Sequence, residues 1–428
     1  MDRNLVHFFL FANFIVAIIY FLRRKNEIPF FLAVFNLMVE YRIATLENGT
    51  STFITYDYGI DFTFNMANAY IASGLITLGT TIMLYSYMAF FKPPVAKVND
   101  SNHLLTLFVS KKKNVIVIGL FFFTLLTIAL SGSSSVGYSF LTKLGNTSFI
   151  LLLFLVVLFT KTNAIVTKVI YGMIFLFLAY LTYSTAIRFQ FLGWVIPVGY
   201  ILVRNVKPGK KLILAFTGIF IILIVFSLAG AMRNNDITGL SFSQMYKLSV
   251  ERMLVADDVN FIDGFIMLYQ VYPKLLDYDY GLQHIAIFLR PIPRSLWPGK
   301  PLASWVRNYQ AKYNGEVLES AGFSPTIWGV FYSEGGEVGI AIFSVFWGWL
   351  LGFCYRKLSA FKSDLSYLLV GILLASLIPV FRSGDMAGDF AIVLMSFWPV
   401  AVFVRYYKKF VKDQLRLEQL RMSSANEA

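Results

Sequence analysis

Long apolar runs alternate with short polar clusters along most of this chain. A helix needs about 20 mostly apolar residues to cross the hydrocarbon core of a bilayer. Eleven runs approach this length and predict an all-α polytopic membrane protein with about eleven transmembrane helices, at residues 4–22, 28–46, 66–91, 114–131, 147–160, 165–184, 187–203, 212–230, 336–355, 365–381 and 388–405.

The composition excludes a water-soluble globule. Hydrophobic residues make up 57% of the 428 positions and charged residues only 14%, against about 45–50% and about 25% in soluble domains. A disordered chain is excluded as well, because 43 Phe, 24 Tyr and 7 Trp are too much apolar surface to leave in water. The single cysteine, Cys354, excludes a disulfide framework and a multi-cysteine metal site.

The net charge of +13 is distributed by side of the membrane. Lys and Arg crowd alternate connections and the C-terminal tail, for example at 23–25, 111–113, 207–211 and 405–421, and are rare in the connections between them. Short cytoplasmic connections carry such an excess of cations. We therefore expect the N-terminus outside, the C-terminus inside, and no binding of nucleic acid.

The longest connection, residues 231–335, lies on the outer side in this topology. Its balanced composition differs from that of a linker, and Phe261, Phe265, Leu268 and Tyr269 recur at helical spacing. The expected organisation is eight transmembrane helices in 1–230, a large structured loop with short helices in 231–335, three helices in 336–405 and a basic cytoplasmic tail in 406–428. Such a loop favours an enzyme or a gated carrier over a simple pore.

A proline-rich segment in this loop carries three cations. Residues 290–301 contain four prolines, which prevent regular helix and favour an extended path. Arg290, Arg294 and Lys300 are then held on a stiff backbone, where guanidinium groups are suited to phosphate oxygens. In the alternative, Leu296 and Trp297 wedge the segment into the bundle, and the cations bind surface carboxylates or lipid headgroups.

Two glycines interrupt the next helical run. Gly335 and Gly336 are expected to break the helix near the membrane surface, with Glu334 and Glu337 on either side. Broken backbone at that depth is tolerated where it lines protein or a water-filled cavity, and carboxylates there are costly unless they are paired or functional. The alternative is an ordinary helix-entry charge at the interface.

Further ionisable residues gather near the outer ends of the predicted spans. Asp385 and Asp389 are four positions apart and face one side of a helix, where an ion pair with Arg382 is more plausible than a metal site. Arg188 either reaches a cavity or extends toward the interface. His284 is a candidate base near neutral pH, although a lone histidine is more often a packed polar residue.

Charges inside the predicted spans are rare. Glu40 and Arg42 lie in the second span and are expected to neutralise one another.

No phosphate-binding glycine loop, nucleotide fingerprint, zinc spacing or hydrolase elbow occurs in the sequence. A nucleotide-sugar enzyme and an ATP-driven pump are therefore disfavoured.

Taken with these motifs, the chain resembles the bacterial O-antigen (or capsular oligosaccharide repeat-unit) polymerases. The resemblance rests on the number of spans, on one large outer loop late in the chain, and on two motifs. These are Ile292-Pro-Arg-Ser-Leu-Trp-Pro-Gly-Lys-Pro301, and Ser324-Pro-Thr followed by Glu334-Gly-Gly-Glu-Val-Gly339. The architecture covers the whole chain, whereas the motifs cover only about 290–340.

The resemblance implies a fold similar to lipid-sugar glycosyltransferases of the GT-C type, in the bacterial inner membrane, with residues 231–335 in the periplasm. It implies a glycosyltransferase of lipopolysaccharide or capsular polysaccharide biosynthesis that needs no cofactor and no metal. The reaction moves a growing glycan from undecaprenyl diphosphate to the sugar end of a newly flipped lipid-linked repeat unit. The implied partners are the undecaprenyl-diphosphate-linked oligosaccharide, membrane lipids and a chain-length regulator protein.

The candidate residues suit this reaction. Negative charge develops on the leaving diphosphate, which fixed cations stabilise, and the acceptor hydroxyl gives its proton to a nearby carboxylate or imidazole. The cations assigned to the diphosphate are Arg188, Arg290, Arg294, Lys300 and Arg382. Glu334 is the first choice for the base and His284 the second, with Glu337 in a secondary role and Asp385 and Asp389 as structural partners of the arginines.

Two other functions remain open at this stage. An O-antigen ligase, or another lipid-sugar transferase, uses similar chemistry and topology. A transporter or flippase of lipid-linked glycan belongs to a different class, but transporters tend to show inverted repeats and charges at mid-membrane. In this chain no repeat is evident and the ionisable residues gather at the outer face.

Overall fold

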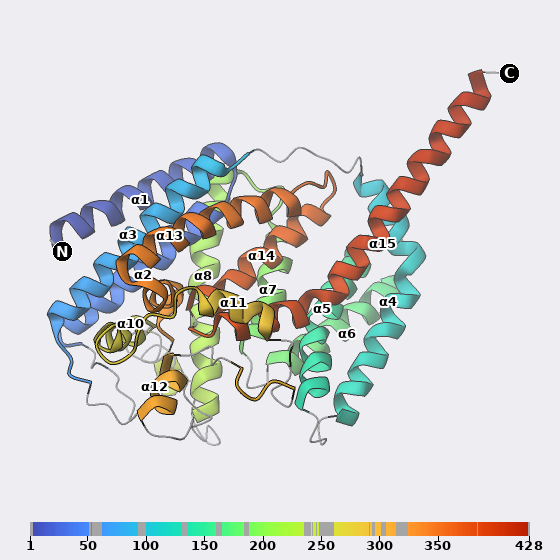
Figure 1. Ribbon diagram of the computed structural model, residues 1–428. Coiled ribbons are helices and arrows are strands. Elements are labelled where there is room, and N and C mark those ends of the chain that lie inside the picture. Colours follow the sequence, from blue (N-terminus) through green and yellow to red (C-terminus); the bar gives the residue numbers. More distant parts are fainter. Residues whose placement is uncertain are drawn as a thin grey trace. The chain divides into compact units, whose positions relative to one another are not determined.

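The computed structural model describes residues 3–50, 53, 62–92, 100–130, 136–159, 165–183, 188–234, 241, 243–244, 246–247, 261–290, 292, 296–300, 305–313, 324–382 and 384–426. Over these residues the chain forms helices connected by turns and no β-sheet (Figure 1). This all-α architecture is the one that the apolar runs predict.

Each apolar run falls on a helix, but α4, α5, α13 and α15 extend well beyond the predicted spans. Their bounds are α1 (Arg3–Arg24), α2 (Ile28–Glu47), α3 (Met66–Phe90), α4 (Asn102–Leu130), α5 (Val136–Phe159), α6 (Ile165–Tyr183), α7 (Arg188–Leu202), α8 (Pro208–Asn234), α10 (Phe261–Val271), α11 (Leu282–Leu289), α12 (Trp305–Tyr313), α13 (Thr326–Leu358), α14 (Leu365–Arg382) and α15 (Met386–Asn426). Local signals explain several ends. Pro29 opens α2, and the Asn65 side chain caps α3 by accepting a hydrogen bond from Ala67 N at 2.8 Å.

Six helices in the described part of the chain are long and apolar enough to cross a membrane: α1, α2, α3, α13, α14 and α15. The chain therefore has the helices of a multi-pass α-helical membrane protein. The other five predicted spans also coincide with helices, which are α4 to α8. That these five cross the membrane stays a prediction, as does the orientation of the chain.

One compact unit consists of Met1–Lys92, Val206–Cys354 and Leu377–Ala391. In it, α1, α2 and α3 pack against one another, and α10 packs on α2 and α3. Trp328 is fully buried at the centre, with Phe35 at 5.6 Å and Phe381 at 5.4 Å between ring centroids. Gly79 permits this packing, because a Cβ at that position would overlap the Trp328 indole.

The second unit consists of Pro93–Asn205, Tyr355–Ser376 and Ile392–Ala428. Leucine, valine and phenylalanine side chains from α4, α5, α14 and α15 form its core. Asp100, before α4, connects this unit to the residues before α14 and to α15. It accepts hydrogen bonds from Lys362 N at 2.7 Å and from the Tyr407 hydroxyl at 3.2 Å. Each unit combines three separate stretches, so compact packing does not follow chain order. The predicted division of the chain by membrane topology stays a prediction.

The long connection contains short helices, as its periodicity predicts. α10 coincides with the apolar positions at 261–269, and α11 and α12 follow it. All three belong to the first unit. α11 is important for the site, because it leads from His284 to the proline-rich segment.

Candidate functional site

The break at Gly335 and Gly336 turns α13 back on itself. Gly335 has φ −179° and Gly336 has φ 64° with ψ −141°, so neither is helical. The ring of Phe331, before the break, lies 5.7 Å from that of Phe343 and 6.3 Å from that of Trp347. A straight helix would separate positions 331 and 347 by about 24 Å. The two parts of α13 therefore form a helical hairpin, which confirms the predicted interruption.

Glycines make this hairpin possible. Gly336 adopts a left-handed conformation that favours glycine, and a Cβ there would lie 2.7 Å from the Tyr278 hydroxyl oxygen. A Cβ at Gly339 would overlap the carbonyl oxygen of Phe331. The sequence Glu334-Gly-Gly-Glu-Val-Gly339 thus encodes a tight reversal. The first arm, Thr326 to Glu334, is buried throughout.

The Glu334 carboxylate at the end of this arm is held by His284 of α11. Its Oε1 accepts a hydrogen bond from His284 N at 3.1 Å, and its Oε2 lies 2.5 Å from His284 Nδ1. The Glu334 side chain has no exposed surface, whereas that of His284 is 15% exposed. The two candidate bases of the sequence analysis, fifty positions apart, therefore form one pair.

Trp347 fixes the state of the imidazole. Its indole Nε1 lies 3.0 Å from His284 Nε2. Because an indole N–H only donates, Nε2 must accept, and the ring proton of neutral His284 then lies on Nδ1 and is donated to Glu334. The ring also stacks on Phe343 at 4.1 Å with an interplanar angle of 11°. His284 is thus oriented on both edges and on one face.

The segment before α11 is bound to the end of the buried arm. Asp279 N donates to Ser333 O at 2.8 Å, and Tyr280 N donates to Glu334 O at 3.1 Å. Carbonyl groups at the end of a helix lack partners within it, so these two bonds satisfy groups that the break exposes. Gly281, with φ 87°, then starts α11 and directs His284 toward Glu334.

Asp279 is a second carboxylate beside the pair and is partly buried. It accepts hydrogen bonds from Gln283 Nε2 at 2.8 Å and from the Tyr272 hydroxyl at 3.3 Å. Burial raises the pKa of Asp279 above its usual value, the hydrogen bonds from Gln283 and Tyr272 oppose this, and the charge of Glu334 adds to it. Sequence reasoning missed this residue because nothing in its spacing distinguishes it from other loop carboxylates.

Arg290 lies at the other end of α11. It is six positions after His284, about 9 Å along a helix axis. Its guanidinium is half-exposed, with Nη1 4.0 Å from Asp385 Oδ2. The same short helix therefore presents a partly buried imidazole at one end and an accessible cation at the other.

The proline-rich segment is partly described. Lys300 Nζ donates to Ile292 O at 2.8 Å and to Arg290 O at 3.3 Å. Its ammonium group thus links the end of the segment to the backbone at its start. Leu296 is 77% exposed and Trp297 is 40% exposed. The wedging of these two side chains into the bundle is therefore wrong. The other part of that alternative, a cation beside a surface carboxylate, agrees with the contact between Arg290 and Asp385. Arg294 lies outside the described residues.

The remaining predicted site residues differ in what the structure says of them. Asp385 Oδ1 caps α15 by accepting from Gly388 N at 2.8 Å, Asp389 is buried in the first turn of α15, and Glu337 is exposed beyond the break. Arg382 ends α14 in the same unit, but its expected ion pair with the two aspartates stays a prediction. Arg188 begins α7 in the second unit, and its side chain lies outside the described residues.

A buried ion pair was missed by the sequence analysis. Arg42 Nε and Nη2 donate to the two carboxylate oxygens of Asp263 at 3.0 and 2.6 Å, and both side chains are almost completely buried. Glu40 instead pairs with Arg3 and with His7. The expected neutralisation of Glu40 by Arg42 is therefore corrected, because residues two apart on a helix do not face each other.

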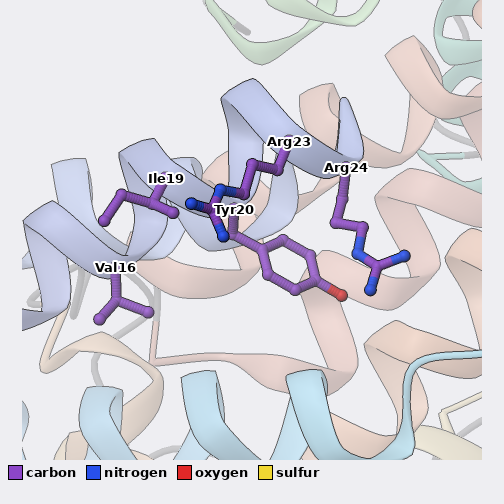
Figure 2. Close-up of a pocket in the computed structure, with 5 residues that line it drawn as sticks. All are labelled: Val16, Ile19, Tyr20, Arg23 and Arg24. Atoms are coloured by element: carbon purple, nitrogen blue, oxygen red, sulfur yellow. The ribbon is translucent and has the colours of Figure 1, made fainter.

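A surface pocket of about 290 Å³ lies elsewhere in the first unit. Val16, Ile19, Tyr20, Arg23 and Arg24 of α1 line it (Figure 2). It shares no residue with the candidate site.

Among the described residues, no three His, Cys, Asp or Glu side chains lie close enough together to hold a metal ion.

Comparisons of the chain with protein-family models, with curated proteins and with solved structures found no match. The six long apolar helices of the described residues define the class, a multi-pass α-helical membrane protein. The site within it is a hydrogen-bonded chain of Glu334, His284 and Trp347 at a helical hairpin, with the cation Arg290 at the end of the helix that carries His284.

Proposed function

We propose that this protein is a glycosyltransferase that polymerises lipid-linked oligosaccharide repeat units at the outer face of the bacterial inner membrane. The growing glycan moves from undecaprenyl diphosphate to the sugar end of a new lipid-linked unit. The observation that carries the proposal is the pairing of His284 with the buried Glu334, on a helix that ends at Arg290. Proton removal and phosphate stabilisation are the two tasks that such a transfer requires.

The proposed reaction forms one glycosidic bond and breaks one bond between a sugar and a phosphate. The hydroxyl oxygen of the acceptor sugar bonds to the anomeric carbon of the donor glycan, and the bond from that carbon to the phosphate oxygen breaks. The electron pair leaves with the undecaprenyl diphosphate, and the hydroxyl proton passes to the base. The activated lipid supplies the driving force, so no nucleotide is consumed.

In this proposal the two candidate bases have different roles. Both oxygens of Glu334 are already bound by His284, and the carboxylate has no exposed surface. His284 is partly exposed, and its Nε2 becomes available when a substrate hydroxyl replaces the indole N–H of Trp347. This arrangement favours His284 as the base and Glu334 as the group that orients it, as a buried carboxylate does in hydrolytic triads.

The leaving diphosphate requires cations, for which Arg290 is the best-supported candidate. Its guanidinium is accessible, and the contact with Asp385 is long enough to be exchanged for a phosphate oxygen. Lys300 closes the segment that follows Arg290. Arg294 and Arg382 complete the proposed set, with Arg294 assigned from the sequence alone. Arg188 belongs to the second unit, and its role stays a prediction from the sequence.

A reconstitution tests the proposed function directly. The full-length protein is purified into liposomes and supplied with the undecaprenyl-diphosphate-linked repeat unit isolated from a strain that lacks the gene. Formation of a ladder of longer lipid-linked glycans without added nucleotide supports the proposal. Failure to form any ladder, with the Glu334→Gln protein as the background control, contradicts it.

A deletion strain separates the neighbouring functions. Core lipid that carries a single repeat unit indicates a lost polymerase, whereas uncapped core with polymer still on the carrier indicates a lost ligase. Accumulation of repeat units on the cytoplasmic face indicates a lost flippase. Only the first pattern agrees with the proposal.

A further inference from the structure

Tyrosines gather beside the Glu334–His284 pair. The rings of Tyr272 and Tyr278 are parallel, with centroids 6.2 Å apart and an angle of 7°. Tyr278 meets Tyr280 edge to face at 6.3 Å, and it meets Tyr332 of the buried arm in the same way at 6.2 Å. The Tyr278 hydroxyl lies against the backbone of Gly336. A continuous series of rings thus leads from the hairpin break outward to Tyr280.

Tyr280 is the exposed end of this series and is held in an unusual conformation. Its side chain is 78% exposed, although its backbone has φ 46°. A bulky residue in the left-handed region is rare and persists where its surroundings enforce it, often at binding sites. The hydrogen bond from Tyr280 N to Glu334 O and the adjoining left-handed Gly281 provide that enforcement here. The backbone therefore presents the ring to solvent.

The groups around Tyr280 are polar, in contrast to the outer side of α11. Asp277, next to Tyr278 in the chain, and Glu337, next to Gly336, are exposed. Asp279, directly before Tyr280, is hydrogen-bonded to Gln283. The outward residues of α11, Ile285 at 52% and Phe288 at 81% exposure, are apolar instead. A lipid tail suits Ile285 and Phe288, whereas a ligand with both apolar C–H faces and hydroxyl groups suits the tyrosines.

We propose that Tyr280, supported edge to face by Tyr278, is a carbohydrate-binding platform that stacks against a sugar ring of the glycan next to the Glu334–His284 pair. This inference rests on the proposed function and adds the subsite through which the sugar part of the substrate is held. Tyr278 connects the platform to Gly336, so a sugar bound on Tyr280 lies beside the break that carries Glu334. The ring face supplies the contact, and the hydroxyl is not required.

Binding of a lipid-free glycan tests the platform. The probe is the repeat-unit oligosaccharide released by mild acid from the lipid-linked repeat unit, whose glycosyl phosphate bond is acid-labile. It is titrated against the full-length protein in nanodiscs by saturation-transfer NMR. We expect Tyr280→Ala to weaken binding by about fivefold, and Tyr280→Phe to bind as the wild type does. Tyr406→Ala, which removes an exposed tyrosine of α15 in the second unit, is the matched control and is expected to change nothing.

Each outcome decides the inference. Equal affinities of the wild type and Tyr280→Ala, or no binding by the wild type, overturn the platform. Equal losses in Tyr280→Ala and Tyr406→Ala overturn it as well. If the oligosaccharide binds through Tyr280 but the protein forms no glycan ladder, the platform stands and the proposed polymerase function falls. If the ladder forms and Tyr280→Ala neither weakens binding nor raises the half-saturating substrate concentration, the polymerase stands without the platform.

Discussion

Phe331 and Trp347 contact each other across the α13 hairpin, with ring centroids 6.3 Å apart. The contact exists because the chain reverses at Gly335 and Gly336. The reversal places Glu334 at the turn and Trp347 on the opposite arm, so that His284 bonds to both of them. The hairpin is therefore the element that assembles the site.

The three glycines of the hairpin differ in backbone conformation and in the space around an added Cβ, so alanine at each position forms a matched set of variants. Gly339→Ala and Gly336→Ala are expected to destabilise the protein, since the first overlaps the Phe331 carbonyl and the second is strained by its left-handed backbone and by Tyr278. Gly335→Ala is expected to be tolerated, because its φ of −179° suits any residue and no atom lies within 4 Å of the new Cβ. Thermal unfolding in detergent measures the order. Equal melting temperatures for all three variants would refute the hairpin.

Removing one partner of the buried ion pair Arg42–Asp263 is expected to destabilise the protein more than removing both partners. Arg42→Ala leaves an uncompensated Asp263 in an apolar core and should cost about 3–5 kcal/mol. The double replacement Arg42→Met with Asp263→Leu removes both charges and should cost much less. Unfolding of the purified variants in denaturant provides the comparison. A double variant that is as unstable as Arg42→Ala would show that packing, rather than the unpaired charge, determines the loss.

Asp279 predicts a pH dependence of stability. Its pKa is raised in the folded protein, mainly by burial, so the folded state binds the proton more tightly than the unfolded state does. This stabilisation is complete below the unfolded pKa of about 4 and is lost as the pH rises through the higher folded pKa. The wild type should therefore lose stability relative to Asp279→Asn as the pH is raised above about 4. Melting temperatures measured across this range check the sign, and a pH-independent difference between the two proteins contradicts it.

Arg290 predicts a charge-specific loss of activity. Arg290→Ala should abolish long-chain product, and Arg290→Lys should restore part of it, because an ammonium keeps the charge but lacks the bidentate fork. Lys274→Ala, which removes an exposed cation of the same loop, should leave the product unchanged. Gel analysis of polymer length at matched expression measures the effect. Normal polymer from Arg290→Ala would exclude this residue from binding diphosphate.

The positions of the single helices were predictable from the apolar pattern, but the packing of the helices against one another was not. Runs such as 4–22 and 66–91 predict helices directly, because crossing a bilayer requires a certain length and hydrophobicity of each helix separately. The grouping of α1 to α3 with α10 was not predictable, since it depends on which helix faces meet. Arg42 shows the same limit, because its partner Asp263 is more than two hundred positions away.

The candidate site was predictable in its residue types and less so in its geometry. Gly335 and Gly336 identified a break, and the structure adds that the break is a reversal. The sequence indicates Glu334 and His284 as two separate candidates, but their pairing requires the backbone hydrogen bonds of Asp279 and Tyr280 to the end of the buried arm. Trp347 could not be chosen from the sequence, because a tryptophan within an apolar run carries no sign of its donor role.

The most direct test of the central claim compares glycan-ladder formation by the wild type, His284→Gln, Glu334→Gln and the double variant at equal protein concentrations in liposomes. If the two side chains act as one proton-accepting unit, each single variant should lower the rate by about 10²–10⁴-fold, and the double variant should be no slower than the slower single variant. Wild-type rates in either single variant, or losses that multiply in the double variant, would contradict the account.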